Sequence, residues 1–361
     1  MFTENWCFYH TVKDAIFSKN QSIRHESELI QHLRALLQED PDLQWRIVSE
    51  GNDGRPQTLE LAVDGTEFLY EPVYELKPSL GWLEGLLPRE CPLLIVTPEL
   101  TRRVLECCKN RGISAIDLNG RTWLRATNLL VDRGSLPERN FRYELEPRNV
   151  YVGKSVRIIR GLLTDIDRNW NQTELLKRTD ASSGLVSRII QYLISQGYLE
   201  KTSSREFRLR DYLALLDDWA KADRFVKRTR TQQYAGYLGS PVALAQLLQE
   251  WAQRESVSIA FTKWIAAWIR HPYTEPMVTS AYVSRLPESS TLAALGLRPV
   301  SEGGKLWLHV PEDEGLLTET QSHNELTLTT DAQIYIDLQS TGLRGPDAAK
   351  ALREWSGFCR P

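Results

Sequence analysis

The fold of this chain is decided by residues 154–210, which read KSVRIIRGLLTDIDRNWNQTELLKRTDASSGLVSRIIQYLISQGYLEKTSSREFRLR. Apolar side chains recur at three- and four-residue steps in 154–166, which is typical of an amphipathic helix. Residues 172–179 predict a short second helix, and 184–197 predict a third that Gly197 ends. Two short alternating runs joined by two serines follow, and they predict a β-hairpin. This succession indicates a winged helix-turn-helix, with the hairpin as its wing.

The side chains that this motif leaves exposed favour contact with DNA. Small hydroxyls at the amino end of the third helix, longer polar side chains after them and two cations on the hairpin make up the candidate set: Ser182, Ser183, Ser187, Arg188, Gln191, Lys201 and Arg205. Small residues let a helix N-terminus approach phosphate, and its free N–H groups and dipole favour an anion there. Arg188 and Gln191 are long enough to reach base edges in a major groove.

The charge of this segment supports the same expectation. Residues 154–210 hold eleven basic residues against six acidic ones, a local charge of +5 in a chain whose net charge is −3. A concentrated basic patch is typical of a surface that binds nucleic acid. Some winged helices bind only proteins, so a protein-docking module is the alternative.

Length and composition limit the class of protein. A chain of 361 residues has room for two or three domains, and 42% apolar and 25% charged residues are ordinary for a globular protein. No apolar run reaches the length of a membrane span, and residues 1–17 lack the basic start and apolar core of a signal peptide. We therefore expect a cytoplasmic protein that does not bind membranes.

The cysteines and histidines predict neither disulfides nor a metal site. Five cysteines are scattered and odd in number, no C-x-x-C pair is present, and the six histidines are widely spaced. We expect no metal and no cofactor.

Residues 1–150 predict a mixed α/β domain. A helix pattern at 26–38 is followed by strand patterns between 43 and 77, with Asp64-Gly65 as a hairpin turn. A continuous apolar run at 91–98 suits a strand buried on both faces, and a further helix and more strands come after it. This order of elements resembles the core of the restriction-endonuclease-like fold.

That resemblance makes Glu75 and Lys77, at the end of a strand pattern, the candidate nuclease residues. In such enzymes two carboxylates hold a magnesium ion, and the lysine orients the nucleophile or stabilises developing charge. The first acid is missing here, because residues 57–58 are Gln-Thr and neither Asp53 nor Asp64 fits the expected place. We therefore expect an inactive scaffold that is not an enzyme. A magnesium-dependent DNA nuclease is the alternative.

Two further blocks complete the chain. Residues 133–153 are polar and typical of a connection, the winged helix-turn-helix takes 151–213, and a mixed α/β domain takes 214–361. In that last domain the patterns predict helices at 212–225, 241–255, 261–270 and 345–355, and strands at 276–286, 303–311 and 332–338.

Charged residues of the last domain have less specific interpretations. A basic cluster either extends the DNA-binding surface or is a solvated helix end: Lys221, Arg224, Lys227, Arg228 and Arg230. Asp331 and Asp337 flank the third predicted strand, and we interpret both as solvated edge residues.

Three stretches resemble the AbiEi-type antitoxins of type IV toxin–antitoxin systems, in the larger form that has an N-terminal domain. They are the strand and helix in 92–124 with Asp117-Leu118-Asn119-Gly120-Arg121, the winged helix in 154–201, and the C-terminal segment 332–355. The chain departs from that family's D-L-x-G-N stretch, because Arg121 follows the glycine.

The resemblance implies a transcriptional regulator in antiviral defence, which binds operator DNA through the winged helix and represses its own operon. It also implies antagonism of a toxin with a nucleotidyltransferase-like fold through the C-terminal domain, without a stable complex. A homodimer, as in many helix-turn-helix regulators, would require a two-fold operator. A non-catalytic scaffold of a defence operon is a further alternative.

Overall fold

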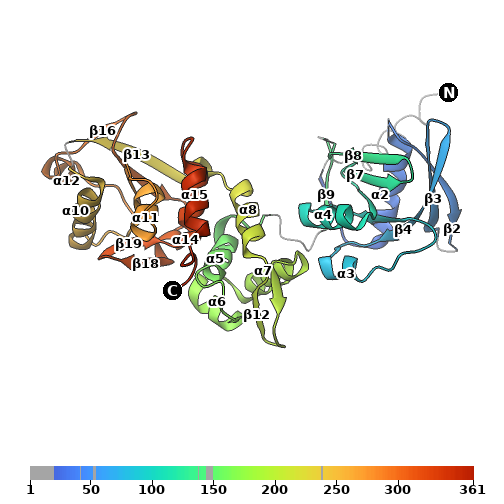
Figure 1. Cartoon of the computed structure of the whole chain (residues 1–361), viewed down its shortest axis with the longest axis horizontal. Helices are drawn as coiled ribbons and strands as arrows, with labels where there is room; N and C mark the ends of the chain where they lie inside the picture. Colours follow the sequence, from blue (N-terminus) through green and yellow to red (C-terminus); the bar gives the residue numbers. More distant parts are fainter. Residues whose placement is uncertain (1–19, 41, 52–53, 137, 144–148, 237–238) are drawn as a thin grey trace, which may run out of the picture. The chain divides into compact units, whose positions relative to one another are not determined.

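A computed structural model describes residues 20–361 of the chain except 41, 52–53, 137, 144–148 and 237–238 (Figure 1). The chain divides into two compact units, residues 1–146 with 195–197 and residues 147–194 with 198–361. Within the described ranges, no helix combines the length and the apolar character that a membrane span needs.

The first unit is built on a mixed sheet with the strand order β2-β3-β4-β5-β6-β7-β8. Its strands are β2 (Gln44–Glu50), β3 (Pro56–Val63), β4 (Thr66–Tyr74), β5 (Leu93–Thr97), β6 (Ser114–Asp117), β7 (Thr122–Ala126) and β8 (Leu129–Arg133). Its helices are α2 (Glu26–Glu39), α3 (Leu80–Glu84) and α4 (Arg102–Arg111). Strands β4, β5 and β6 are parallel, and the other neighbouring pairs in this sheet are antiparallel.

Helices cover both faces of this sheet. On β5, Leu94 and Val96 pack in the core that α2 closes, whereas Ile95 packs in a second core with α3 and α4. All five residues of β5 are buried, which confirms the strand predicted in 91–98. The expectation of a mixed α/β domain is confirmed at this level.

The hairpin turn of the first unit has the conformation that its residues predict, but the predicted connection contains a strand. Asp64 and Gly65 both have positive φ, as a two-residue hairpin turn requires. Within the predicted connection 133–153, residues Asn140–Tyr143 form β9, which pairs in parallel with β1 (Asn20–Ile23). Phe141 is buried there, so pairing and the burial of one aromatic ring outweigh the polar composition of the segment.

The second unit begins with the segment that the sequence predicts to be a winged helix-turn-helix. It contains α5 (Gly153–Leu162), α6 (Gln172–Thr179), α7 (Ser183–Ser195) and a small sheet of β10 (Trp170–Asn171), β12 (Glu206–Leu209) and β11 (Leu199–Lys201). Helix α6 coincides with its prediction, and Gly197 has a φ of 72° just after α7. The two-residue strand β10 is too short to leave a pattern, so the sequence does not predict it.

The remainder of the second unit is a mixed sheet with the order β16-β13-β17-β15-β14-β19-β18 and the helices around it. Its strands are β13 (Thr229–Ala235), β14 (Ile259–Thr262), β15 (Thr279–Val283), β16 (Arg298–Val300), β17 (Leu306–Pro311), β18 (Thr320–His323) and β19 (Leu326–Thr329). Its helices are α8 (Tyr212–Ala222), α9 (Phe225–Arg228), α10 (Pro241–Arg254), α11 (Lys263–Arg270), α12 (Ser289–Ala294), α13 (Gly315–Thr318), α14 (Asp331–Gln339) and α15 (Gly345–Glu354).

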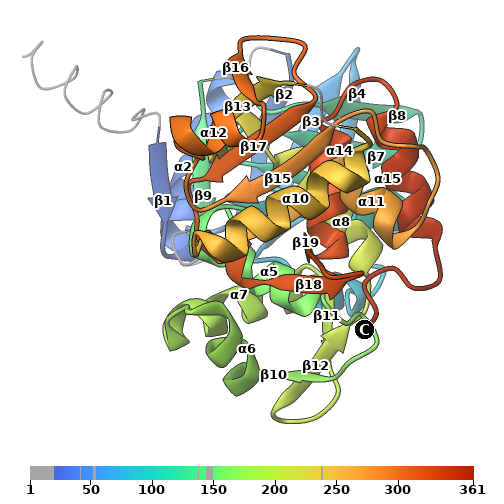
Figure 2. The same ribbon diagram turned by 90° about the vertical axis from the view of Figure 1, so that its left-hand side faces the viewer.

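Helix α10 lies across one face of this sheet, and α11 and α14 lie on the other (Figures 1 and 2). One continuous apolar core runs from Leu162 of α5 and Val186 of α7 through Leu216 of α8 to Phe261 in the sheet. The DNA-binding head predicted at 151–213 and the sheet domain therefore share a core.

The predicted strand at 332–338 is wrong, because these residues form helix α14. Thr330 caps the helix by accepting a hydrogen bond from the backbone N–H of Gln333. Every residue from Asp331 to Leu338 is buried, so the helix has no solvent face and shows no helical amphipathic period. Similarly, residues 261–262 end strand β14, and α11 begins only at Lys263.

Candidate nucleic-acid interface

The serines at the amino end of α7 are exposed but partly engaged. The Ser182 hydroxyl accepts a hydrogen bond from the backbone N–H of Leu185 at 3.3 Å, so it caps the helix. The side-chain amide of Gln172, at the start of α6, donates to the hydroxyl and the carbonyl oxygen of Ser183 at 3.2 and 3.3 Å. These two serines therefore fix the turn between α6 and α7 as well as facing solvent.

A groove of about 670 Å³ lies between α6, α7 and the wing. Four of the seven predicted residues line it, namely Ser187, Gln191, Lys201 and Arg205. Arg188 is exposed on α7 next to Ser187. In both views the α6 end and the wing point away from the C-terminal sheet (Figures 1 and 2).

The groove also contains residues that the sequence did not single out. Gln172 and Thr173 line it from the first turn of α6, and Lys177 lines it one turn later. The sequence includes Lys177 in the local charge but does not place it in the groove, because the orientation of α6 relative to the wing depends on how the two pack. Lys177 is exposed and adds a third cation to the groove.

The predicted basic patch is only partly available to a ligand. Six of its eleven residues already have partners: Lys154 with Asp180, Arg157 with Asp313, Arg160 with Gln333, Arg168 with Glu174, Arg178 with Glu319, and Arg208 with Glu200. The other five have no acidic partner among the residues that the structure describes: Lys177, Arg188, Lys201, Arg205 and Arg210. All five are exposed, and three of them line the groove.

Three of the engaged arginines hold the head to the sheet domain. Arg157 forms an ion pair with Asp313, and this hydrogen bond raises the pKa of the Arg157 guanidinium. Arg160 is buried and donates to Gln333 at 3.2 Å and to the carbonyl oxygen of Gly315 at 3.1 Å. Arg178 of α6 pairs with Glu319 at 3.1 Å. Because α5 and α6 are fixed in this way, helix α7, which packs on them, is held in place.

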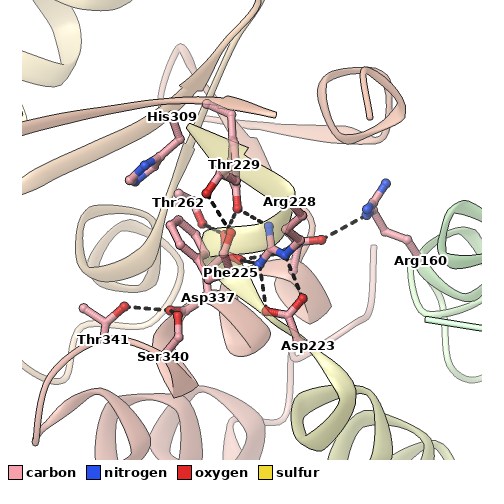
Figure 3. A network of polar contacts seen from close by, with 12 residues as sticks. Arg160, Asp223, Phe225, Arg228, Thr229, Thr262, His309, Asp337, Ser340 and Thr341 are labelled. Atoms are coloured by element: carbon pink, nitrogen blue, oxygen red, sulfur yellow. Dashed lines mark hydrogen bonds and ion pairs between the residues drawn. The ribbon is translucent and has the colours of Figure 1, made fainter. Parts of the chain in front are cut away.

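The basic cluster at 221–230 is neither uniformly a DNA surface nor a solvated helix end, because Arg228 points inward. Its guanidinium lies between the carboxylates of Asp223 and Asp337 (Figure 3), at 2.7 and 2.5 Å. Lys227 and Arg230 of the cluster are exposed. Pairing with two carboxylates compensates the cost of burying this cation.

The interpretation of Asp331 and Asp337 as solvated edge residues is wrong. Asp331 is buried and forms an ion pair with Arg270 at 2.7 Å. Asp337 is fully buried and accepts hydrogen bonds from Arg228, Gln333, Tyr282 and Thr262. Both errors follow from the wrong strand prediction, because a helix buried on all sides places its acids inside.

The nuclease candidates lie together just after β4. The Glu75 carboxylate accepts a hydrogen bond from the backbone N–H of Lys77 at 3.0 Å. Among the described residues, no group of three or more His, Cys, Asp or Glu side chains could hold a metal ion. Asp53 lies outside the described residues.

Comparisons with protein-family models, with curated proteins and with solved structures find no match to this chain.

Proposed function

We propose that the protein is a DNA-binding transcriptional repressor of the AbiEi-antitoxin type, which binds double-stranded operator DNA through its winged helix. The observation that supports this most is the groove between α6, α7 and the wing. Three exposed cations line it and form no ion pair among the described residues, although Glu174 and Glu206 line the same groove. Exposed cations that have no acidic partner can contact the phosphates of a duplex, and a rigid head holds them in place for this contact.

In this proposal α7 enters the major groove, where Arg188 and Gln191 contact base edges. Lys177, Lys201 and Arg205 contact phosphates on either side and set the orientation of the head. The shared core and the arginine contacts of α5 keep this surface rigid, so binding requires little ordering of the protein.

The remaining parts of the proposal come from the family resemblance. The C-terminal α/β domain would antagonise a nucleotidyltransferase-like toxin, the protein would act in the cytoplasm, and a homodimer would bind a two-fold operator. Footprinting on the promoter of the chain's own operon tests the repressor part directly.

The residue-level test is a double substitution, Arg188→Ala with Lys201→Ala. We expect weaker DNA binding and a dependence of log affinity on log salt that is shallower by about 0.9, because Lys201 contacts a phosphate whereas Arg188 contacts a base edge. Arg254→Ala with Lys305→Ala is the matched control, because both residues are exposed in the sheet domain, outside the head. An unchanged affinity and slope in the head variant, or an equal loss in the control, would contradict the proposal.

A further inference from the structure

The two faces of the C-terminal sheet differ in chemistry. The pairing register places Thr262, Ser280 and Trp307 in one row across β14, β15 and β17, and Tyr282 and His309 in the next row. Because side chains alternate along a strand, all five point to the face that α11 and α14 cover. The opposite face, under α10, carries apolar residues from the same strands.

Several polar atoms of this face are buried without a partner. The Ser280 hydroxyl and the Nε2 atom of His309 have no hydrogen-bond partner among the described residues, and both side chains are at most 1% exposed. The Nδ1 atom of His309 lies 2.7 Å from the Thr231 hydroxyl. In the tautomer in which the Thr231 hydroxyl donates to Nδ1, Nε2 carries the proton and is a donor without an acceptor. Such groups are rare in native cores and call for a ligand or water.

Lys263, a buried residue, supplies a third donor on this face. It is 3% exposed, and its backbone φ of 55° is uncommon for a residue other than glycine. Its ammonium lies 3.7 Å from the centroid of the Phe225 ring and 5.6 Å from that of Trp307. Among the described residues, the ammonium interacts with Asp337 and Asp223 only through their charges and forms no hydrogen bond with them.

The nearby carboxylates do not form an ion pair with the ammonium of Lys263. Asp337 accepts two hydrogen bonds on each oxygen, from Arg228 and Gln333 on one and from Tyr282 and Thr262 on the other. The Asp223 carboxylate is bound to Arg228 as well. The two acids and Arg228 thus form a closed network (Figure 3), which leaves the ammonium of Lys263 as a buried cation without a direct acidic partner among the described residues.

We propose that this face is a binding site for a small oxyanion, a carboxylate or a tetrahedral anion, held by Lys263, Ser280 and His309. The anion accepts from the ammonium, the hydroxyl and the Nε2–H group, which supplies each donor with the acceptor it lacks. This site lies in the C-terminal domain, so it does not depend on the proposed DNA-binding function.

Phe225 closes the site. Its ring contacts Lys263, and its centroid lies 5.0 Å from that of the His309 ring, so it occupies the space between the two donors. The ring is only half-buried and belongs to the four-residue helix α9, whose next side chain, Val226, is 86% exposed. An outward rotation of Phe225 would vacate the position beside both donors that its ring now occupies.

Anion binding in this site is coupled to protonation. Burial lowers the pKa of Lys263 to about 8, with Arg228 lowering it further and Asp337 and Asp223 acting in the opposite direction. Burial and the charge of Lys263 lower the pKa of His309 to about 3, so the imidazole is neutral. A bound anion favours the charged ammonium and raises its pKa. Binding at pH 8 therefore takes up as much as about 0.5 proton.

The test is isothermal titration of the full-length protein with sulfate and, separately, with acetate at constant ionic strength and pH 8, in two buffers of different ionisation enthalpy. Neither probe titrates near pH 8, so proton uptake reports on the protein. The preferred probe shows whether the site suits a tetrahedral or a planar anion. We expect saturable binding with proton uptake, and a loss of roughly ten- to hundredfold in Lys263→Met, the value of one charge-assisted hydrogen bond.

Three further variants show whether the anion binds here or elsewhere on the protein. Lys227→Met removes an exposed charge from α9 and should leave binding unchanged, whereas Phe225→Ala should bind the anion more tightly because no ring has to move. Lys201→Ala with Arg205→Ala removes groove cations and should leave proton uptake unchanged, which distinguishes this site from the DNA surface. Circular dichroism melts check that each variant is folded. Absence of saturable binding in both wild type and Phe225→Ala, or equal affinity of wild type and Lys263→Met, overturns the proposal.

Discussion

Replacement of the buried carboxylate of Asp337 by an amide should destabilise the second unit by about 3 kcal/mol. Asp337 accepts hydrogen bonds from Arg228 at 2.5 Å, from Gln333 at 2.8 Å and from Tyr282 at 2.9 Å, and a further one from Thr262. Asparagine keeps the shape but has one acceptor oxygen, so its NH₂ group faces other donors.

The magnitude follows from the ion pair. Removing one partner of a buried pair costs about 3–5 kcal/mol, because the other charge loses its compensation. Arg228 keeps Asp223 as a second partner, so we expect the lower end of that range. Urea unfolding of Asp337→Asn and wild type at pH 7 measures the difference. Asp347→Asn is the control, because this acid is exposed in the first turn of α15 and should cost less than about 1 kcal/mol.

The effect should also depend on pH in one direction. Burial by itself raises the pKa of Asp337, but the charges of Arg228 and Lys263 and the hydrogen bonds outweigh burial and hold the pKa below its ordinary value. A carboxyl with a lowered pKa stabilises the fold above its unfolded pKa, and this contribution is lost as pH falls through the folded pKa. The gap between wild type and variant should be constant near pH 6, below the titration of Lys263, and shrink below about pH 4. A gap under about 1 kcal/mol at pH 7, or one that persists unchanged well below the folded pKa, would refute this account of the network.

Four further outcomes are expected. Lys201→Ala with Arg205→Ala should make the slope of log DNA affinity against log salt shallower by about 2, measured by fluorescence anisotropy; an unchanged slope means that the wing does not contact phosphates. Gly345→Ala should lower the urea midpoint of the second unit, because a Cβ would lie 2.2 Å from a backbone carbonyl oxygen of α14. Burial raises the pKa of Asp117 to about 7 against its three backbone hydrogen bonds, so its contribution to stability should be lost as pH rises from about 4 through 7; a carboxyl titration midpoint below pH 5, followed by NMR, would contradict this. Glu75→Ala should leave any magnesium-dependent cleavage of DNA by the preparation unchanged; cleavage that disappears in this variant would instead support the nuclease alternative.

The sequence predicted an element correctly where the residues within that element determine its structure. Helix α6, the hairpin turn at Asp64-Gly65 and the buried strand β5 each follow from local spacing or from the conformational preference of one residue type. The exposed positions of Arg188, Lys201 and Arg205 follow in the same way, because burying one apolar stripe decides which side chains remain outside.

Partner choice could not be predicted. Arg157 and Arg178 read as part of a basic patch, yet they pair with Asp313 and Glu319, more than a hundred residues away. Ion pairs between residues far apart in the chain leave no periodic pattern in the sequence. Together with local ion pairs, they occupy about half of the basic residues of the head.

The sequence by itself thus determined the helices and wing of the head, the strands of the first sheet and the outward face of α7, since these depend on periodicity over a few turns. Only the tertiary structure decided that residues 332–338 are helical, because a segment buried on every side shows no amphipathic period. The same burial gave Asp337 its charged partners and placed Lys263 out of reach of a carboxylate among the described residues, since the electrostatic environment of a side chain depends on what packs around it rather than on its neighbours in the chain.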